Sequence, residues 1–296
     1  MGYLRTKLTN YLLKGLTRIS PTLNTKLLYY RRFHKRLDLR DPQTSNEKVL
    51  WLKLHTYYKN ALVSQCADKF LVREYVKQCG CEEILNELYA SYHNVDDIVW
   101  EELPQKFVLK SSYFTGYNIL VPDKSQLDIS ATKERMRYWQ SSTDHLIASE
   151  MQYNSPHTIL CEHFIESHDG GVPEDYKIYC CNGEPIYVMV CIGRKEGKHP
   201  KFYYFDQEGK LQRELSKDGL EAPADFSFAK PVGWDEMFNY ARKLTKPFPF
   251  VRCDFYLSDG KVYFGELTFT PARGLDTQKL PYADLLIGSK IDLVTI

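Results

Sequence analysis

The sequence predicts an α+β fold, with helices in the first part of the chain and antiparallel strands in most of the second. Apolar residues recur at helical spacing near the N-terminus. Further along the chain, runs of alternating apolar and polar residues flank Asn-Gly, Glu-Gly and Asp-Gly pairs, which favour tight hairpin turns. With 296 residues, 43% of them hydrophobic, the chain is long enough to form a sizeable core.

The N-terminal segment is the most basic part of the chain. The whole chain has a net charge of +1, yet residues 1–40 carry ten Lys and Arg residues against a single acid, Asp38. Five apolar residues recur at helical spacing beside these cations: Leu4, Leu8, Tyr11, Leu12 and Leu16. This pattern fits an amphipathic helix on an anionic membrane surface, and it fits equally a helix packed on its own domain with a solvated basic face.

Targeting signals and the pattern of cysteines indicate the cellular compartment in which the protein is expected. No uninterrupted apolar stretch follows the first basic residues, and the longest apolar run, residues 186–192, is far below the ~20 residues that a membrane crossing needs. The eight cysteines include no C-x-x-C pair, and the eight histidines lack zinc-type spacing. We therefore expect a cytoplasmic protein without a zinc site, peripheral at the inner membrane face if the N-terminal helix meets lipid.

Two more helices are expected before residue 80. The first covers residues 47–58, and Ser45 or Asn46 could cap its N-terminus. The second covers residues 68–78 and places Lys69 and Arg73 on one face, four residues apart. Such a pair is either a phosphate-facing pair or part of an ordinary exposed face.

Residues 106–122 form a candidate flap. Short strands over residues 107–110 and 117–121 flank a loop of small residues. The residues of interest are Lys110, which ends the first strand, and Ser111, Ser112, Thr115 and Gly116 in the loop. Backbone N–H groups of such a loop can cradle phosphates while the lysine neutralises charge. The motif G-x-x-x-x-G-K-[ST] is absent, and an ordinary hairpin is the alternative.

The next elements are a surface helix over residues 133–150 and a buried strand over residues 158–166. Glu162 on this strand either offers hydrogen bonds to a base and ribose or is the exposed acid of a core strand. Two hairpins follow, and then a helix. The hairpins pair residues 176–181 with 187–193 and residues 201–205 with 210–215, and the helix covers residues 234–246.

A hairpin near the C-terminus carries two carboxylates, Asp254 and Glu266. Its strands, residues 250–258 and 262–269, alternate in polarity around Asp259-Gly260. A two-residue loop sets Asp254 opposite Gly265 and sends Glu266 to the other face, whereas a three-residue loop sets Asp254 opposite Glu266. The sequence permits both loops, and convergence of the two carboxylates is expected to require the longer one.

Converging carboxylates repel each other unless a cation lies between them. Magnesium is the natural candidate, because it takes hard oxygen ligands and usually keeps one or two protein carboxylates together with substrate phosphates. Thr268 lies on the same face as Glu266 and adds a hydroxyl oxygen. The alternative is a solvated strand face without a metal.

The order of these parts resembles the TupA-like branch of the ATP-grasp superfamily, bacterial enzymes associated with teichuronopeptide and other surface polysaccharide synthesis. The resemblance runs from about residue 48 to about residue 275. It lies in an ordered set of segments: ADKFLVREYV with Lys69, FVLKSSYFTGYN with Lys110, LCEHFIE with Glu162, PEDYKIYCCNGEP, VRCDFYL and YFGELTFTPARGL.

The resemblance implies an ATP-grasp fold in which two α+β lobes clamp ATP, preceded by a helical N-terminal region. On this basis the chain divides into a basic helical segment, a helical part of the ATP-grasp unit, a small lobe with the nucleotide flap, and a larger antiparallel β lobe with the metal site. The expected boundaries are residues 1–45, 46–105, 106–165 and 166–296.

The resemblance also implies roles for individual residues. Lys69 and Lys110 would contact the phosphates of ATP, and Asp254 and Glu266, with Thr268, would bind Mg²⁺. The flap residues would close over the phosphates, and the strand after them would meet adenine and ribose: Ser112, Thr115, Gly116 and Asn118, then Glu162, Phe164 and Ile165. Three basic residues would act in catalysis: Lys177, Arg194 and Arg252.

Two positions depart from the family pattern. The flap has bulky residues, Tyr113 and Phe114, and a single glycine, Gly116, where the family is usually richer in glycine. Thr268 stands where many ATP-grasp enzymes have Asn.

The implied activity is an ADP-forming carboxylate-amine ligase that works through an acyl phosphate. It would join an amino acid to a sugar or uronic acid in bacterial surface polysaccharide biosynthesis. The expected partners are this small-molecule or glycan substrate and, through the N-terminal helix, an anionic membrane; no nucleic acid is expected. The alternatives are a glycosyltransferase, which the absence of a D-x-D motif disfavours, a sugar kinase, or a nucleotide-binding protein without catalysis.

Overall fold

The computed structural model describes residues 2–166, 173–193 and 200–293. The chain divides into two compact units. Unit 1 comprises residues 1–24 and 60–165, and unit 2 comprises residues 25–59 and 166–296. None of the helices in the described ranges is long and apolar enough to span a membrane.

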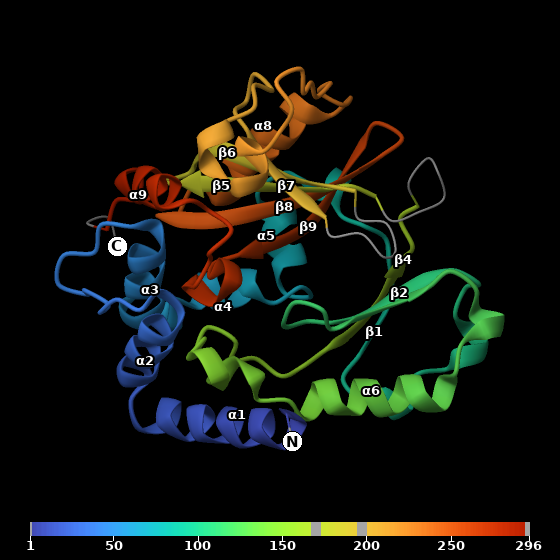
Figure 1. Cartoon of the computed structure of the whole chain (residues 1–296). Helices are drawn as coiled ribbons and strands as arrows, with labels where there is room; N and C mark the ends of the chain where they lie inside the picture. Colours follow the sequence, from blue (N-terminus) through green and yellow to red (C-terminus); the bar gives the residue numbers. More distant parts are fainter. Residues whose placement is uncertain (1, 167–172, 194–199, 294–296) are drawn as a thin grey trace. The chain divides into compact units, whose positions relative to one another are not determined.

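Unit 1 is built on a four-stranded antiparallel sheet with the order β1-β4-β2-β3. Figure 1 labels β1, β2 and β4 of this sheet. Its strands are β1 (Leu88–Tyr92), β2 (Phe107–Ser111), β3 (Asn118–Val121) and β4 (Ile159–His163). Its helices are α1 (Gly2–Ile19), α4 (Ala61–Ala67), α5 (Val72–Gln78) and α6 (Ile129–Ser141). Helix α6 packs on the sheet, because Met136 and Trp139 are buried in one core with Phe107 and Leu109 of β2.

Helix α1 packs on unit 1 through a largely polar face. It lies against the short 3-10 helix η6 (Asp144–Ala148). Thr17 Oγ1 donates a hydrogen bond to the Leu146 carbonyl at 2.6 Å, and Lys14 Nζ lies 2.8 Å from Asp144 Oδ1. Among the residues of this helix whose burial is described, Leu13 is a buried apolar one. The helix is therefore attached to its own unit.

Unit 2 is built on a five-stranded antiparallel sheet with the order β7-β6-β5-β8-β9. Its strands are β5 (Asp175–Cys181), β6 (Glu184–Ile192), β7 (Lys201–Phe205), β8 (Phe250–Ser258) and β9 (Lys261–Thr268). Its helices are α3 (Ser45–His55), α7 (Lys217–Leu220), α8 (Trp234–Thr245) and α9 (Pro281–Ser289), with most of α2 (Pro21–Phe33). Short 3-10 helices complete the two units: η1 (Tyr57–Lys59), η2 (Glu82–Ile84), η3 (Val95–Asp97), η4 (Trp100–Glu102), η5 (Lys124–Gln126), η7 (Arg213–Leu215) and η8 (Pro271–Gly274).

Helix α8 covers one face of this sheet (Figure 1). Its residue Trp234 lies edge-on to the Tyr176 ring of β5, with 6.2 Å between ring centroids. Tyr176 pairs with Phe255 of β8, so both belong to the covered face. Because successive strand residues point to opposite faces, Lys177 and Asp254 belong to the other face. The apolar residues of β8 on the covered face thus pack in the core. The polar residues on the opposite face are available for a functional site.

Helix α3 differs from the expectation at its cap. Thr44 caps it: its side chain accepts the Glu47 N–H at 3.2 Å, and Glu47 accepts the Thr44 N–H at 3.0 Å. The predicted caps, Ser45 and Asn46, are wrong. Both lie inside the helix and bind Asp284 of α9, the Ser45 hydroxyl at 2.5 Å, so they tie the two helices together.

Three other elements are shorter than expected. Helix α5 begins at Val72, because Asp68 Oδ1 accepts the N–H groups of Phe70 and Leu71 and holds that stretch as a turn; Lys69 therefore does not lie on the helix of Arg73. The helix expected over residues 133–150 is α6 followed by η6. The strand expected over residues 210–215 is reduced to one bridge at Leu211 and then helix η7.

Candidate functional site

Asp254 on β8 pairs directly with Glu266 on β9. The hairpin turns on two residues, Asp259 and Gly260, which have φ values of 50° and 74°, and Ser258 pairs with Lys261. The register then shifts by one residue beyond Asp254, and Gly265 is the residue left without a partner. The expectation that convergence requires a three-residue loop is therefore wrong, because a β-bulge makes the same correction.

Glycine at position 265 allows the strands to approach each other at the bulge. A Cβ atom there would lie 2.9 Å from the Asp254 carbonyl oxygen and 3.2 Å from the Tyr256 ring. Any side chain would push β9 away from β8 at this point. The bulge thus positions Glu266 next to Asp254.

Lys177, Asp254 and Glu266 form one row across β5, β8 and β9. Lys177 Nζ lies 2.8 Å from Asp254 Oδ2 and 2.7 Å from Asp175 Oδ2. The Lys177 and Asp254 side chains are 14% and 3% exposed. Burial strengthens each of these ion pairs, because little water is present to screen them.

Arg252 lies in the next row on the same face, opposite Thr268. Its Nε and Nη2 atoms donate to the two oxygens of Asp254, each at 2.7 Å. The same Nη2 donates to Thr268 Oγ1 at 3.2 Å and lies 3.8 Å from Glu266 Oε1. Thr268 in turn donates to Glu266 Oε1 at 2.8 Å. Arg252 therefore holds Asp254 through a two-pronged contact and lies farther from Glu266.

The electrostatics of this cluster keep both cations charged. Burial opposes the charge of Lys177, but Asp254 and Asp175 hold the pKa of its amine above the usual value. Burial likewise opposes the charge of Arg252, and Asp254 raises the pKa of its guanidinium well above the usual value. Three carboxylates, Asp175, Asp254 and Glu266, face two cations, which leaves one negative charge in the cluster.

The donor set fits magnesium. Asp254 and Glu266 present hard oxygen atoms opposite each other, Thr268 adds a hydroxyl, and the cluster has an excess negative charge. Within the described ranges no group of three or more His, Cys, Asp or Glu residues is placed to hold a metal. A magnesium site here depends on two carboxylates completed by substrate phosphates, which is the usual arrangement for this ion.

Unit 1 carries a second charged cluster, centred on Glu162 of β4. Lys110 Nζ lies 2.7 Å from Glu162 Oε2, and Arg73 Nη1 lies 3.4 Å from Oε1. The Glu162 side chain is 7% exposed. Arg73 also donates to the Asn86 carbonyl at 2.7 Å, and burial lowers the pKa of its guanidinium while Glu162 opposes that effect. The structure thus brings Lys110 and Glu162 together, although they lie on different strands.

Lys69 contacts the flap loop. Its backbone N–H donates to the Ser112 carbonyl at 2.9 Å, and its Nζ donates to the Phe114 carbonyl at 3.2 Å. Ser112 is fully buried, and its own N–H donates to the Thr158 carbonyl at 2.8 Å. Thr115 and Gly116 lie exposed at the tip. The part of the loop open to a ligand is therefore the tip.

The bulky flap residues are packed inward. The Tyr113 ring lies 4.9 Å from His157 and 5.3 Å from Tyr153, and the Phe114 ring stacks on His145 at 6.2 Å. Phe114 and Gly116 have φ values of 69° and 81°, so the loop turns through two left-handed residues. An aromatic cluster thus anchors this flap where glycines would leave it mobile.

The remaining predicted site residues are dispersed. Phe164 is buried, Asn118 is exposed on β3, and unit 1 ends at Ile165. Arg194 lies outside the described residues. Asp175 was not among the predicted site residues, although its place two residues before Lys177 puts both on one strand face, which is the signal that could have revealed it.

The family model of TupA-like ATP-grasp proteins matches residues 47–292. A search of curated proteins gives no match.

Among solved structures, the chain is similar to a D-alanine–D-alanine ligase from Bacillus anthracis, at 17% identity and a TM-score of 0.49, over 77% of this chain and 67% of that one. It is also similar to an L-amino acid ligase from Bacillus licheniformis, at 16% identity and a TM-score of 0.43, over 72% of this chain and 45% of that one. A third is the N5-carboxyaminoimidazole synthetase from Staphylococcus aureus complexed with ADP, at 13% identity and a TM-score of 0.43, over 76% of this chain and 52% of that one. The chain spans about half the length of the last two proteins.

Proposed function

The chain belongs to the TupA-like ATP-grasp family, and on this premise we propose that it is an ATP-dependent ligase that joins a carboxylate to an amine. The observation that carries the proposal is the row of Lys177, Asp254 and Glu266 on one sheet face, with Arg252 beside it. Such a cluster suits phosphoryl transfer, because catalysis there consists mainly of positioning and charge stabilisation.

Within this cluster, Asp254 and Glu266 would hold Mg²⁺, and Thr268 would contribute its hydroxyl oxygen. The ion would neutralise the charge that develops on the transferred γ-phosphoryl group of ATP, which is a substrate of the reaction. Lys177 and Arg252 already lie beside these carboxylates and would bind phosphate oxygens. For Arg194, which lies outside the described residues, the resemblance alone supports a role in catalysis.

The residues of unit 1 would bind the nucleotide. Lys69 and Lys110 would meet the phosphates, with Thr115 and Gly116 at the exposed flap tip. Ser112 and Asn118 would support the flap at its two ends. The strand segment with Glu162, Phe164 and Ile165 would meet adenine and ribose. The ion pair of Lys110 with Glu162 supports these roles, because it places a lysine and a hydrogen-bond acceptor side by side.

The proposed reaction has two steps. A carboxylate is a poor acyl donor because oxide would have to leave, so its oxygen first takes the γ-phosphoryl group of ATP and gives an acyl phosphate and ADP. The amine nitrogen then attacks the carbonyl carbon. A C–N bond forms, the C–O bond to phosphate breaks, phosphate leaves with the electron pair, and the nitrogen loses a proton.

The substrates we propose are an amino acid and a sugar or uronic acid of a bacterial surface polysaccharide. The resemblance to polysaccharide-associated proteins supports this assignment. The enzyme would act in the cytoplasm, where ATP is available, and no nucleic acid takes part.

Helix α1 supports a peripheral contact with an anionic membrane. Leu8, Tyr11 and Leu12 are 61%, 72% and 61% exposed, on the side of the helix away from buried Leu13 and Thr17. The helix carries several cations and no acidic residue. Two copies of such a helix would repel each other, whereas an anionic bilayer would take up both the apolar side chains and the charge.

The proposed function is tested by calorimetric titration of ATP with Mg²⁺. The proteins are the wild type, Asp254→Asn, Glu266→Gln and a control, Asp235→Asn, whose side chain is 65% exposed on α8. We expect the wild type and the control to bind Mg-ATP and both carboxylate variants to bind at least tenfold more weakly. Glu266 is the less buried of the pair, so its variant tests the site even if Asp254→Asn folds poorly.

The decisive follow-up is ADP release, which a ligase shows only when a carboxylate and an amine are both supplied. A panel of amino acids with sugars and uronic acids provides the substrates. If the wild type does not bind Mg-ATP but binds a nucleotide sugar, the ligase proposal is overturned and a glycosyltransferase is favoured. Phosphorylation of a sugar without an amine would identify a kinase instead.

A further inference from the structure

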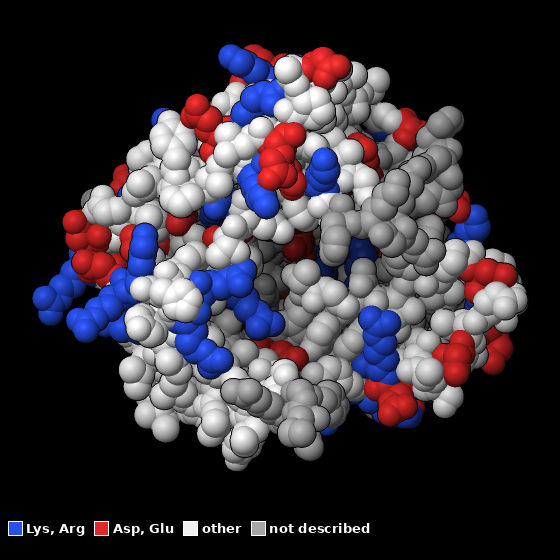
Figure 2. Space-filling model, viewed as in Figure 1, with Lys and Arg blue, Asp and Glu red and all other residues white. Residues whose placement is uncertain are grey.

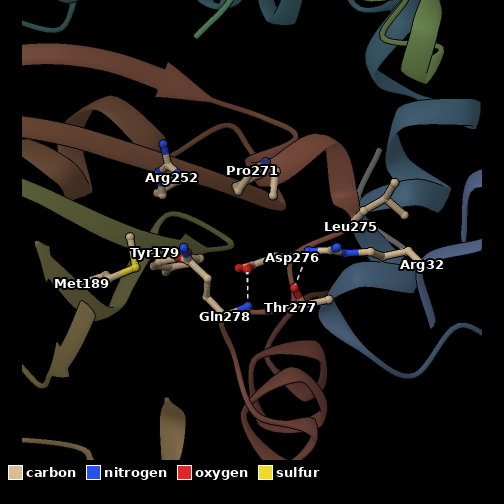
Figure 3. A pocket seen from close by; sticks show the side chains of 10 residues that line it. Arg32, Tyr179, Met189, Arg252, Pro271, Leu275, Asp276, Thr277 and Gln278 are labelled. Atoms are coloured by element: carbon tan, nitrogen blue, oxygen red, sulfur yellow. Dashed lines mark hydrogen bonds between the residues drawn. The ribbon is translucent and has the colours of Figure 1, made fainter. Parts of the chain in front are cut away.

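Unit 2 contains a pocket of about 170 Å³ beside the carboxylate cluster (Figure 3). It is lined by α2, by β5, β6 and β8, and by the segment after β9. Arg32 and Arg252 lie on different walls, with Asp276 between them and Tyr179 beside Arg252. For comparison, an engineered apolar cavity of ~150 Å³ holds benzene. The pocket is therefore large enough for a small molecule.

Two of the three charges in this pocket are compensated by the protein. Arg252 is held by Asp254 at 2.7 Å. Asp276 accepts the Gln278 N–H at 2.9 Å and lies 3.5 Å from Lys279 Nζ. The arrangement leaves Arg32 as the charge that determines which ligand the pocket prefers.

The Arg32 guanidinium is available to an anion. It donates to Thr277 Oγ1 at 2.5 Å, and within the described part of the chain no carboxylate lies within ion-pair distance of it. Figure 2 shows Lys and Arg side chains gathered around α2 on the face in view. A cluster of one sign raises the local concentration of oppositely charged small molecules. The pocket therefore favours a ligand with a carboxylate at the Arg32 end.

The wall that faces Arg32 is held in a strained conformation. Ala272, Arg273 and Gly274 have φ values of 48°, 64° and 77°, three left-handed residues in succession. Left-handed backbone is unfavourable for residues other than glycine, and it persists where the surroundings hold it. Helix α3 also fixes Asp276 on the same segment, because Asn46 donates to its carbonyl at 2.9 Å and accepts its N–H at 3.0 Å. The fold therefore fixes Asp276 in this wall of the pocket.

Arg252 belongs both to this pocket and to the cluster proposed to hold Mg²⁺. A ligand in the pocket would lie beside the groups that handle the phosphoryl transfer. Arg32, in contrast, precedes residue 47, where the family match begins. Its place in the pocket is a property of this chain that the family match does not cover.

We propose that this pocket binds the amino acid substrate of the ligase, with its carboxylate on the Arg32 guanidinium and its amino group beside Asp276, between Arg32 and Arg252. This inference rests on the proposed function and specifies the amine substrate as an α-amino acid with a small side chain. Arg32 is a specificity-determining residue in this arrangement. The planar guanidinium recognises a carboxylate through two parallel hydrogen bonds, which a neutral amide cannot form.

The test measures amino acid binding by calorimetry on the full chain without nucleotide. The probes are glycine, L-alanine, L-serine and L-glutamate, each compared with its α-amide. The variants are Arg32→Gln and, as a matched control, Arg31→Gln, which changes the neighbouring exposed residue of α2 that does not line the pocket. Mg-ATP binding is measured on the same three proteins.

We expect at least one of glycine, L-alanine and L-serine to bind the wild type, and we expect its amide and the larger L-glutamate to bind at least tenfold more weakly. Arg32→Gln should lose about 10- to 100-fold in affinity for the amino acid, as expected for removal of a charge-assisted contact, and Arg31→Gln should match the wild type. All three proteins should bind Mg-ATP equally. The inference is overturned if the wild type binds none of the three small amino acids, if acid and amide bind alike, or if Arg32→Gln retains full affinity. If the wild type fails to bind Mg-ATP, that result counts against the proposed ligase activity and not against the amino acid pocket.

Discussion

Asp254 faces Glu266 because β9 contains one extra residue, Gly265, in a hairpin that turns on only two. A turn of two positive-φ residues matches the natural twist of paired strands, so the loop itself is in a favourable form. The bulge then places the second carboxylate on the face of the first. The candidate metal site therefore depends on a glycine that has no functional group.

The role of this glycine predicts the effect of Gly265→Ala. The new methyl group would lie 2.9 Å from the Asp254 carbonyl oxygen, so β9 must shift. We expect a loss of about 1–3 kcal/mol in the free energy of unfolding, together with weaker Mg-ATP binding. Denaturant titration and calorimetry measure the two effects.

A helical glycine provides the control for this substitution. A Cβ atom at Gly15 of α1 would meet nothing within 4 Å, so Gly15→Ala should raise stability by about 0.5–1 kcal/mol and leave Mg-ATP binding unchanged. If Gly265→Ala behaves in the same way, the bulge does not constrain the site.

The pairing of Lys110 with Glu162 predicts coupling in a double-mutant cycle. Their side chains are 22% and 7% exposed, so the ion pair is partly shielded from water. We expect Lys110→Met and Glu162→Gln to be non-additive by about 1–2 kcal/mol in the free energy of unfolding. The control is Arg137 with Asp96 in the same unit, both 56% exposed, where coupling should stay below about 0.5 kcal/mol. Equal coupling in both cycles would contradict a special role for Glu162.

The histidine beneath the flap predicts a pH dependence. Burial, followed by the nearby His157 and Lys14, lowers the pKa of His145 to about 4, against an opposing effect of Asp144. The unfolded chain binds a proton at this residue near its ordinary pKa of about 6.5, so between these values the unfolded state holds more protons. The free energy of unfolding should therefore fall as the pH is lowered from about 6.5 to 4.

This dependence can be assigned to the residue by substitution. His145→Gln should weaken the dependence of the free energy of unfolding on pH between about 4 and 6.5. His55→Gln, which changes an exposed histidine, should leave this dependence unchanged. Denaturant titrations at pH steps across this window give the measurement. A slope that is unchanged in His145→Gln would show that other groups cause it.

The exposed apolar face of α1 predicts binding to anionic vesicles. The wild type should sediment with vesicles of phosphatidylcholine and phosphatidylglycerol and not with phosphatidylcholine alone, and 0.5 M salt, roughly the concentration at which screening becomes short-ranged, should weaken the binding. Leu12→Glu should abolish it without loss of stability, because Leu12 is 61% exposed. Val99→Glu, at a 47% exposed apolar residue elsewhere in unit 1, is the control and should bind as the wild type does. If the wild type binds neutral and anionic vesicles equally, or if Leu12→Glu still binds anionic vesicles, the proposed membrane contact of α1 is contradicted.

Much of the local structure was predictable from the sequence. The alternation over residues 250–258 predicted β8 with its observed limits, and the same alternation placed Arg252 and Asp254 on one face. The ordered segments around Lys69, Lys110 and Glu162 predicted the family, which the match over residues 47–292 confirms. The alternation of a strand and the motifs of a family depend on residues close together in the sequence, so both can be predicted without a structure.

The tertiary structure alone decided which distant residues meet. The bulge at Gly265 sets Glu266 against Asp254, β5 brings Asp175 and Lys177 to the same cluster, and α2 brings Arg32 to the pocket. Each of these contacts depends on strand register or on the packing of segments far apart in the chain. Register follows from the fit of whole strands and from steric contacts at single residues, and local periodicity does not encode it. The sequence by itself therefore determined the family and most of the elements of this protein, and the tertiary structure decided how the charges of its candidate site are paired.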